Sequence, residues 1–191
     1  CVMNPNSTSA NRFKNYLDLN SIKCIPFKNL MQTELNEKTP EEYEYDLIMS
    51  VYSPYIISDK ILKKAKYGGV NLHPGKLPEY AGLNLVSWSI VNGETYHYVT
   101  LHKMHSKIDG GTILTSKKFE IDEIDNAYTL SAKCSVHGVE IIREFLEVFS
   151  VNKESCFCGI EQNLENRYYY DKKSPIERPI DLEESVLKIK R

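Results

Sequence analysis

The sequence lacks the features that mark phosphate-loop, membrane-spanning and disulfide-stabilised proteins. All nine glycines lie at Gly68 or later, so no Gly-rich phosphate-binding loop can precede that residue. No apolar run approaches the roughly 20 residues of a membrane-spanning helix. The five cysteines are odd in number and mostly scattered, which is more typical of a reducing compartment than of a disulfide framework. We therefore expect a cytoplasmic protein that does not insert into membranes.

The chain length, the net charge and the cysteine spacing further limit the class of protein. The chain has 191 residues, of which 41% are hydrophobic, so it can bury one substantial core. Its formal net charge of −2 argues against a nucleic-acid-binding protein that relies on a basic surface. Cys156 and Cys158 have no second Cys or His pair nearby, so the spacing does not predict a zinc site. We expect neither nucleic acid nor a metal ion as a partner.

Strand and helix patterns alternate along the chain. An apolar strand pattern at residues 46–51 is followed by a helix pattern at 58–66 and a second strand pattern that ends at His73. Further elements are expected as a helix at 83–93, strands at 97–105 and 111–121, and a long helix at 126–149. This alternation predicts an α/β fold with parallel strand pairing.

A pair of polar residues stands out at the end of the second strand, in "VNLHPG". Asn71 and His73 alternate with apolar residues, so both side chains point to the same face of the strand. Pro74 lacks a backbone donor and therefore ends the strand directly after His73. Ligands of open α/β sheets bind outside the carboxyl ends of the strands. The pair is thus either a structural pair beneath a turn or part of a reactive site.

A second strand end contributes "KIDGG", in which Asp109 precedes two glycines that allow a sharp turn. An Asp beside His73 would orient the imidazole and stabilise its protonated form. Asn71 could then donate to an oxygen that becomes negative, while His73 takes a proton from the nucleophile. Because the motif holds no Ser or Cys, we expect the nucleophile to belong to the substrate.

The stretches "VNLHPGKLPEYAG" and "VTLHKMHSKIDGG" resemble the 10-formyltetrahydrofolate-dependent formyltransferases. The resemblance covers residues 1–150 and implies a Rossmann-like catalytic domain, with a mostly parallel central sheet and helices on both faces. Residues 151–191 would then form a short β-rich tail that is a possible dimer contact. The family's first strand, Gly-containing turn and helix are missing before residue 1. We therefore expect the native chain to be longer.

Within the family, the sequence is most similar to the sugar N-formyltransferases. This resemblance implies transfer of a formyl group from 10-formyltetrahydrofolate to a nucleotide-linked amino sugar, with Asn71, His73 and Asp109 as catalytic residues. The expected acceptor is a dTDP-4-amino-4,6-dideoxyhexose for surface polysaccharides such as the O-antigen of lipopolysaccharide, and the expected assembly is a homodimer. Two alternatives remain: a glycinamide ribonucleotide formyltransferase, and a non-catalytic fragment that binds a nucleotide sugar.

The resemblance also implies the residues that contact the two substrates. The folate candidates lie in two segments, and they are Ser53, Tyr55, Ile56, His105 and Ser106. Lys76 and Tyr80 are candidates for holding the nucleotide sugar, through charge and through packing respectively. Plain core packing is the alternative for Tyr55 and Ile56, and an ordinary surface position is the alternative for Lys76.

Overall fold

The computed structural model describes residues 2–3, 18–19, 21, 25–26, 44–53 and 55–171. The chain forms two compact units, residues 1–42 and residues 43–191. In the first unit, strand β1 (Val2–Met3) pairs in parallel with β2 (Ile25–Pro26). The second unit contains all of the sequence-predicted site residues.

The second unit is built on a four-stranded sheet with the order β3-β4-β6-β7. Its strands are β3 (Ile48–Val51), β4 (Gly69–His73), β6 (Tyr96–Lys103) and β7 (Ile113–Glu120). Strands β3 and β4 are parallel, whereas β6 runs antiparallel to both β4 and β7. The antiparallel direction of β6 brings residues of two distant sequence segments directly opposite each other, which matters for the site.

The remaining elements complete an α/β arrangement. They are α3 (Asp59–Leu62), β5 (Ala81–Gly82), α4 (Leu85–Val91), α5 (Ala127–Val151) and β8 (Tyr169–Tyr170). In the four-stranded sheet one of the three pairings is parallel, whereas both two-stranded sheets of the described residues, β1-β2 and β5-β8, are parallel, so the sheet content is mixed. The predicted α/β class is confirmed. Of the predicted β-rich tail, the described residues 152–171 contain the two-residue strand β8 and two short 3-10 helices, η1 (Ser155–Phe157) and η2 (Leu164–Asn166), and residues 172–191 lie outside the described residues. No described helix has the length and apolarity to cross a membrane.

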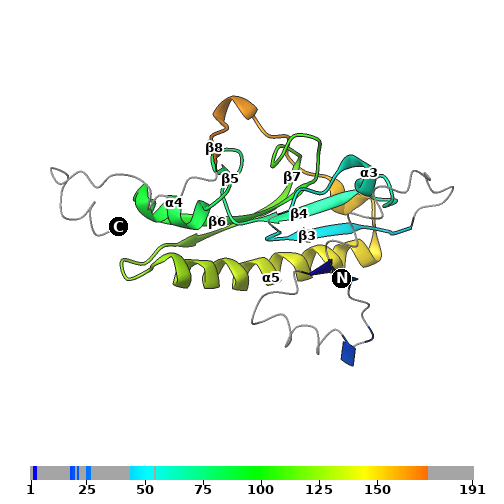
Figure 1. Ribbon diagram of the computed structural model, residues 1–191, viewed down its shortest axis with the longest axis horizontal. Helices are drawn as coiled ribbons and strands as arrows, with labels where there is room; N and C mark the ends of the chain where they lie inside the picture. Colours follow the sequence, from blue (N-terminus) through cyan, green and yellow to red (C-terminus); the bar gives the residue numbers. More distant parts are fainter. Residues whose placement is uncertain are drawn as a thin grey trace. The chain divides into compact units, whose positions relative to one another are not determined.

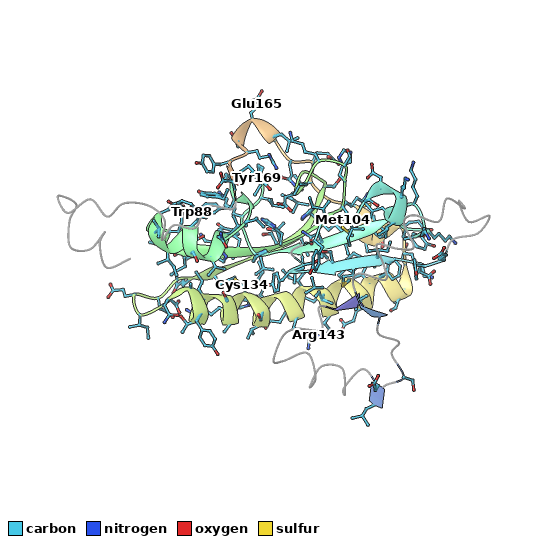
Figure 2. The ribbon with its side chains drawn as sticks, viewed as in Figure 1. Trp88, Met104, Cys134, Arg143, Glu165 and Tyr169 are labelled. Atoms are coloured by element: carbon cyan, nitrogen blue, oxygen red, sulfur yellow. The ribbon has the colours of Figure 1, made fainter. Side chains whose placement is uncertain are left out.

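Helix α5 lies along one face of the sheet, and the loops with β5 and β8 lie on the opposite face (Figure 1). Asn126 caps its first turn and forms a capping box with Thr129. The buried residues of α5 recur every three or four positions, which keeps them on one side of the helix. They are Leu130, Cys134, Gly138, Ile141 and Phe145. Figure 2 shows Cys134 between the helix and the sheet and Arg143 on the outer side.

The core joins this helix face to the inner sides of β4 and β6. Val70 and Leu72 of β4 are almost fully buried in this cluster, next to Val99 and Leu101 of β6. Because side chains alternate along a strand, this leaves Asn71 and His73 on the opposite side, toward β5 and β8. The apolar half of β4 thus fixes which face of the sheet carries the polar pair.

Gly138 is a point of close contact between α5 and the residues that it covers. A Cβ atom there would lie 2.6 Å from the Tyr52 hydroxyl and 2.7 Å from Leu72 Cδ2. Gly138→Leu should lower the free energy of unfolding by about 2–3 kcal/mol, since overpacking outweighs the gain in helix propensity. Chemical denaturation followed by circular dichroism measures this. The exposed Ala132→Leu on the same helix should change it by less than about 0.5 kcal/mol, and equal effects would contradict the close approach.

Candidate active site

A cavity of 580 Å³ opens beside the carboxyl ends of β3 and β4. Asn71, His73 and Asp109 all contribute to its wall. Four of the five residues predicted to contact folate also line it: Ser53, Tyr55, Ile56 and His105. Ser106 is outside the wall and pairs its hydroxyl with Nδ1 of His105. The roles of these residues in binding stay predictions, but the cavity brings most of them together.

His73 is held by two contacts, one at each ring nitrogen. Nε2 lies 2.7 Å from the carbonyl oxygen of Tyr80, which can only accept, so Nε2 carries a proton and donates it. Nδ1 lies 3.4 Å from Oδ1 of Asp109. The imidazole is 3% exposed, and this burial lowers its pKa although Asp109 and the Tyr80 carbonyl act in the opposite direction. In its neutral form, His73 therefore presents Nδ1 as a proton acceptor.

Asp109 occupies a strained position in the loop between β6 and β7. Its φ of +52° lies in the left-handed region that non-glycine residues rarely adopt. Oδ2 accepts a hydrogen bond of 2.9 Å from the Gly82 backbone N–H. Burial alone would raise the pKa of this carboxyl, but the neighbouring His102 and His73 and the Gly82 N–H together lower it. Asp109 thus stays ionised next to His73 and favours the protonated form of that imidazole.

His102 is the site residue that the sequence reasoning missed. It lies directly opposite Asn71 in the antiparallel pairing of β4 with β6. Nδ1 lies 2.8 Å from the carbonyl oxygen of Lys103, so it carries the ring proton and leaves Nε2 as an acceptor. Nε2 lies 3.1 Å from the Asn71 amide nitrogen and accepts one of its two N–H bonds. This contact orients the Asn71 amide and leaves its second N–H available.

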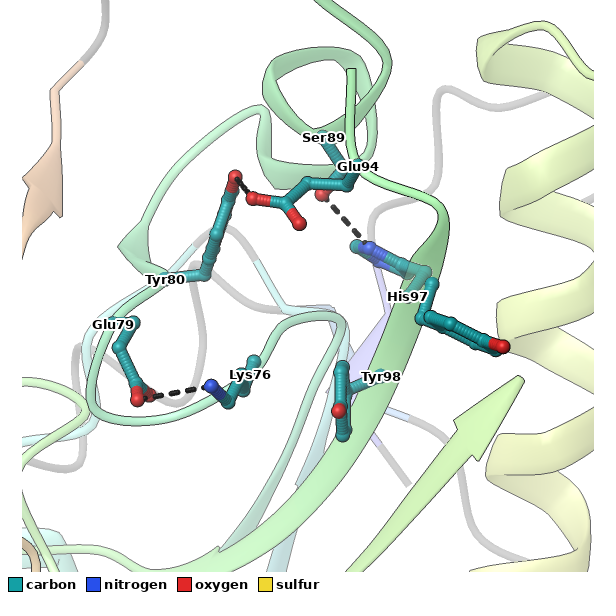
Figure 3. Close-up of a pocket in the computed structure, with 8 residues that line it drawn as sticks. Lys76, Glu79, Tyr80, Ser89, Glu94, His97 and Tyr98 are labelled. Carbon is teal, nitrogen blue, oxygen red and sulfur yellow. Dashed lines mark hydrogen bonds and ion pairs between the residues drawn. The ribbon is translucent and has the colours of Figure 1, made fainter. Parts of the chain in front are cut away.

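Side chains of β6 also hold the turn that follows His73. His97 donates from Nε2 to the Pro74 carbonyl at 3.1 Å, and its Nδ1 accepts from the Ser89 hydroxyl at 2.9 Å (Figure 3). Burial lowers the pKa of His97 to about 4, so the ring remains neutral. The Thr100 hydroxyl donates to the carbonyl of Gly75 at 2.7 Å. The backbone on the carboxyl side of His73 is therefore fixed by two hydrogen bonds from β6.

The two predicted sugar-binding residues lie in a different place from the catalytic candidates. Lys76 and Tyr80 line a second cavity of 170 Å³, shown in Figure 3, and not the larger one. The Lys76 ammonium pairs with Glu79 at 3.0 Å, and the Tyr80 hydroxyl donates to Glu94 at 2.6 Å. Their predicted contact with the nucleotide sugar stays a prediction. It would require Lys76 and Tyr80 to replace their contacts with Glu79 and Glu94 by contacts with the substrate.

The arrangement combines a hydrogen-bond donor with a cluster of acceptors. Nδ1 of His73 and Nε2 of His102 lie 3.4 and 3.7 Å from Oδ1 of Asp109. Ring nitrogens and carboxylate oxygens can bind a metal ion, and they can equally bind a proton. The geometry therefore does not test the expected absence of a metal, which stays a prediction. The free Asn71 N–H and the proton-accepting His73 are the two groups that acyl-type transfer requires.

Solved structures of two enzymes share this fold. WlaRD, a sugar 3N-formyltransferase crystallised with dTDP and 5-N-formyl-tetrahydrofolate, superposes with a TM-score of 0.75 at 22% identity, over 98% of this chain and 65% of its own. The N-formyltransferase of Helicobacter canadensis, in complex with folinic acid and dTDP-3-aminofucose, gives a TM-score of 0.69 at 22% identity, over 98% and 76%. These likenesses confirm the predicted fold class.

Sequence comparison gives the family itself. The GDP-perosamine N-formyltransferase of Brucella melitensis biotype 1 is 36% identical over 112 residues, which make up 56% of this chain and 43% of that enzyme. The chain thus spans less than half the length of this curated relative. The family model described as formyl transferase matches residues 9–146, a segment that includes Asn71, His73 and Asp109. The chain belongs to the formyl transferase family.

Proposed function

We propose that this protein transfers a formyl group from 10-formyltetrahydrofolate to the amine of a nucleotide-linked amino sugar. The observation that carries the proposal is the convergence of the Asn71 amide, the buried His73 imidazole and the Asp109 carboxylate on one cavity. The relatives support the choice of substrates, since WlaRD was crystallised with a folate and dTDP, and the Brucella melitensis enzyme is named for GDP-perosamine. For this chain, we propose a dTDP-linked 4-amino-4,6-dideoxyhexose as the acceptor.

The geometry supports a direct transfer between the two substrates. The sugar amine attacks the formyl carbon, and the new C–N bond places negative charge on the formyl oxygen, to which Asn71 donates its free N–H. Nδ1 of His73 accepts the amine proton, and Asp109 stabilises the resulting imidazolium. The bond from the formyl carbon to the folate nitrogen then breaks, and that nitrogen receives the proton.

The two alternative functions are less well supported. The Brucella melitensis enzyme is named for GDP-perosamine and WlaRD for a sugar, which does not favour a glycinamide ribonucleotide formyltransferase. A non-catalytic fragment is disfavoured because His73, Asp109 and Asn71 keep an arrangement that serves proton transfer. We further propose that the protein works in the cytoplasm in O-antigen synthesis. Exposed Tyr168 and Tyr169 support a homodimer formed through the C-terminal segment.

Replacement of the proposed base should nearly abolish turnover. His73→Asn and Asp109→Asn should each lower kcat by about 10²–10⁴-fold, because they remove the proton acceptor or the charge that stabilises its protonated form. The measurement is the absorbance change on release of tetrahydrofolate, with GDP-, dTDP- and UDP-linked amino sugars and glycinamide ribonucleotide as acceptors. His137→Asn on α5 serves as the control and should turn over normally. Turnover with the ribonucleotide alone would reject the proposed substrate class.

His102 should matter through the orientation of Asn71. His102→Phe removes the acceptor for the Asn71 amide while keeping a planar ring of similar size. We expect kcat to fall by about 10–100-fold with a much smaller change in KM, since the amide acts on charge that forms during the reaction. Steady-state kinetics with saturating folate separates the two constants. A variant with unchanged kcat would show that the amide does not need His102.

A further inference from the structure

The chain returns to the active site after helix α5. Residues 159–171, here called the C-terminal strap, follow the 3-10 helix at Ser155–Phe157 and include β8 (Figure 1). Ile160 exchanges two backbone hydrogen bonds with Ile113 at the start of β7, of 2.9 and 2.8 Å. At its other end, β8 pairs with β5. The strap is therefore anchored on both sides of the loop that carries Asp109.

The side chain of Gln162 contacts that loop at two carbonyl groups. Its side-chain amide nitrogen donates to the carbonyl oxygen of Asp109 at 3.0 Å and to that of Gly111 at 2.6 Å. One amide group thus holds the peptide carbonyls on both sides of Gly110. Arg167 adds a third contact, 3.0 Å from its guanidinium to the carbonyl of Ile108. Three of the four carbonyls from residue 108 to residue 111 are bound by the strap.

These contacts act on a backbone that needs external support. Asp109 has a positive φ, which is less favourable for a non-glycine residue than the right-handed region. A loop of this kind keeps its geometry only where the surrounding structure restrains it. Gln162 restrains the carbonyl of the strained residue itself. Without that bond, the loop can relax, and the carboxylate would move relative to His73.

The opposite end of the strap contacts the segment after β4 that includes Tyr80 and Gly82. Through β8, backbone bonds from Ala81 to Tyr168 and from Leu83 to Tyr170 fix the segment around Gly82. The Gly82 N–H donates to Oδ2 of Asp109, and the nearby Tyr80 carbonyl accepts from His73. The strap therefore restrains both loops that set the distance between Asp109 and His73.

We propose that the C-terminal strap positions the catalytic carboxylate. Gln162 is the positioning residue: it holds Asp109 at the distance and angle at which the carboxylate stabilises His73 once that imidazole has accepted the amine proton. The inference rests on the proposed function, since it assigns Asp109 a role in turnover. It gives residues 159–171 a part in the reaction in addition to the dimer contact proposed for this segment.

The test uses the full chain with Gln162→Glu, a change of almost equal size that replaces the amide donor by a carboxylate. Two carbonyl oxygens would then face an acceptor, and the loop should shift. We expect kcat to fall by about 10–100-fold with KM for both substrates within about threefold, because misplacement of a catalytic group by 1 Å can cost about 100-fold. Glu165→Gln is the matched control, as Glu165 is exposed at the outer tip of the strap (Figure 2) and should turn over normally.

A double-mutant cycle separates positioning from a general loss of stability. If Gln162 acts through Asp109, adding Gln162→Glu to Asp109→Asn should cost less than about threefold further, whereas independent effects would multiply. Multiplying effects, or a normal kcat in Gln162→Glu, would overturn the inference. If Gln162→Glu does not fold, Gln162→Met removes the donor without adding charge and must show the same pattern. A normal rate in Asp109→Asn alone would instead reject the catalytic assignment in the proposed function.

Discussion

The buried contact between His73 and Asp109 is the interaction on which the rest of the site depends. A carboxylate and an imidazole with Nδ1 and Oδ1 3.4 Å apart lie at a position where both are largely removed from water. Burial alone would neutralise both groups, which suits His73 as a proton acceptor but would remove the negative charge by which Asp109 stabilises the protonated imidazole. The Gly82 N–H helps to keep the Asp109 carboxyl ionised, and the hydrogen bond to the Tyr80 carbonyl fixes the imidazole of His73 as an Nε2 donor. The pair can therefore accept one proton, at Nδ1 of His73.

Three parts of the chain supply the restraints on this pair. The apolar side of β4 packs on α5 and turns Asn71 and His73 toward the cavity. Strand β6 lies opposite and contributes His97 and Thr100 to the turn after His73, and His102 to the Asn71 amide. The C-terminal strap holds the loop of Asp109 from the outside. Each polar group of the site therefore has a partner on another element, which keeps a polar cluster ordered in a low-dielectric surrounding.

The sequence predicts those parts of the fold and of the site that follow a local pattern. Period-two alternation and Pro74 place Asn71 and His73 on one face at a strand end, and spacing of three or four predicts α5. The partnership of His102 with Asn71 depends on the antiparallel register between two strands, which no local pattern encodes. The contact from Gln162 to Asp109 joins residues 53 positions apart through an irregular segment without periodicity. Such contacts arise from tertiary packing, and only the structure shows them.

The central claim is that the amine attacks the formyl carbon directly, with His73 as the base and no formylated protein group. A single-turnover reaction with folate that carries a ¹³C-formyl group, followed by NMR, tests this most directly. The label should pass from the folate signal to a formamide signal on the sugar, with no labelled protein at any time. A transient ¹³C-formyl signal that remains with the protein after rapid gel filtration would contradict direct transfer and require a nucleophile within the cavity.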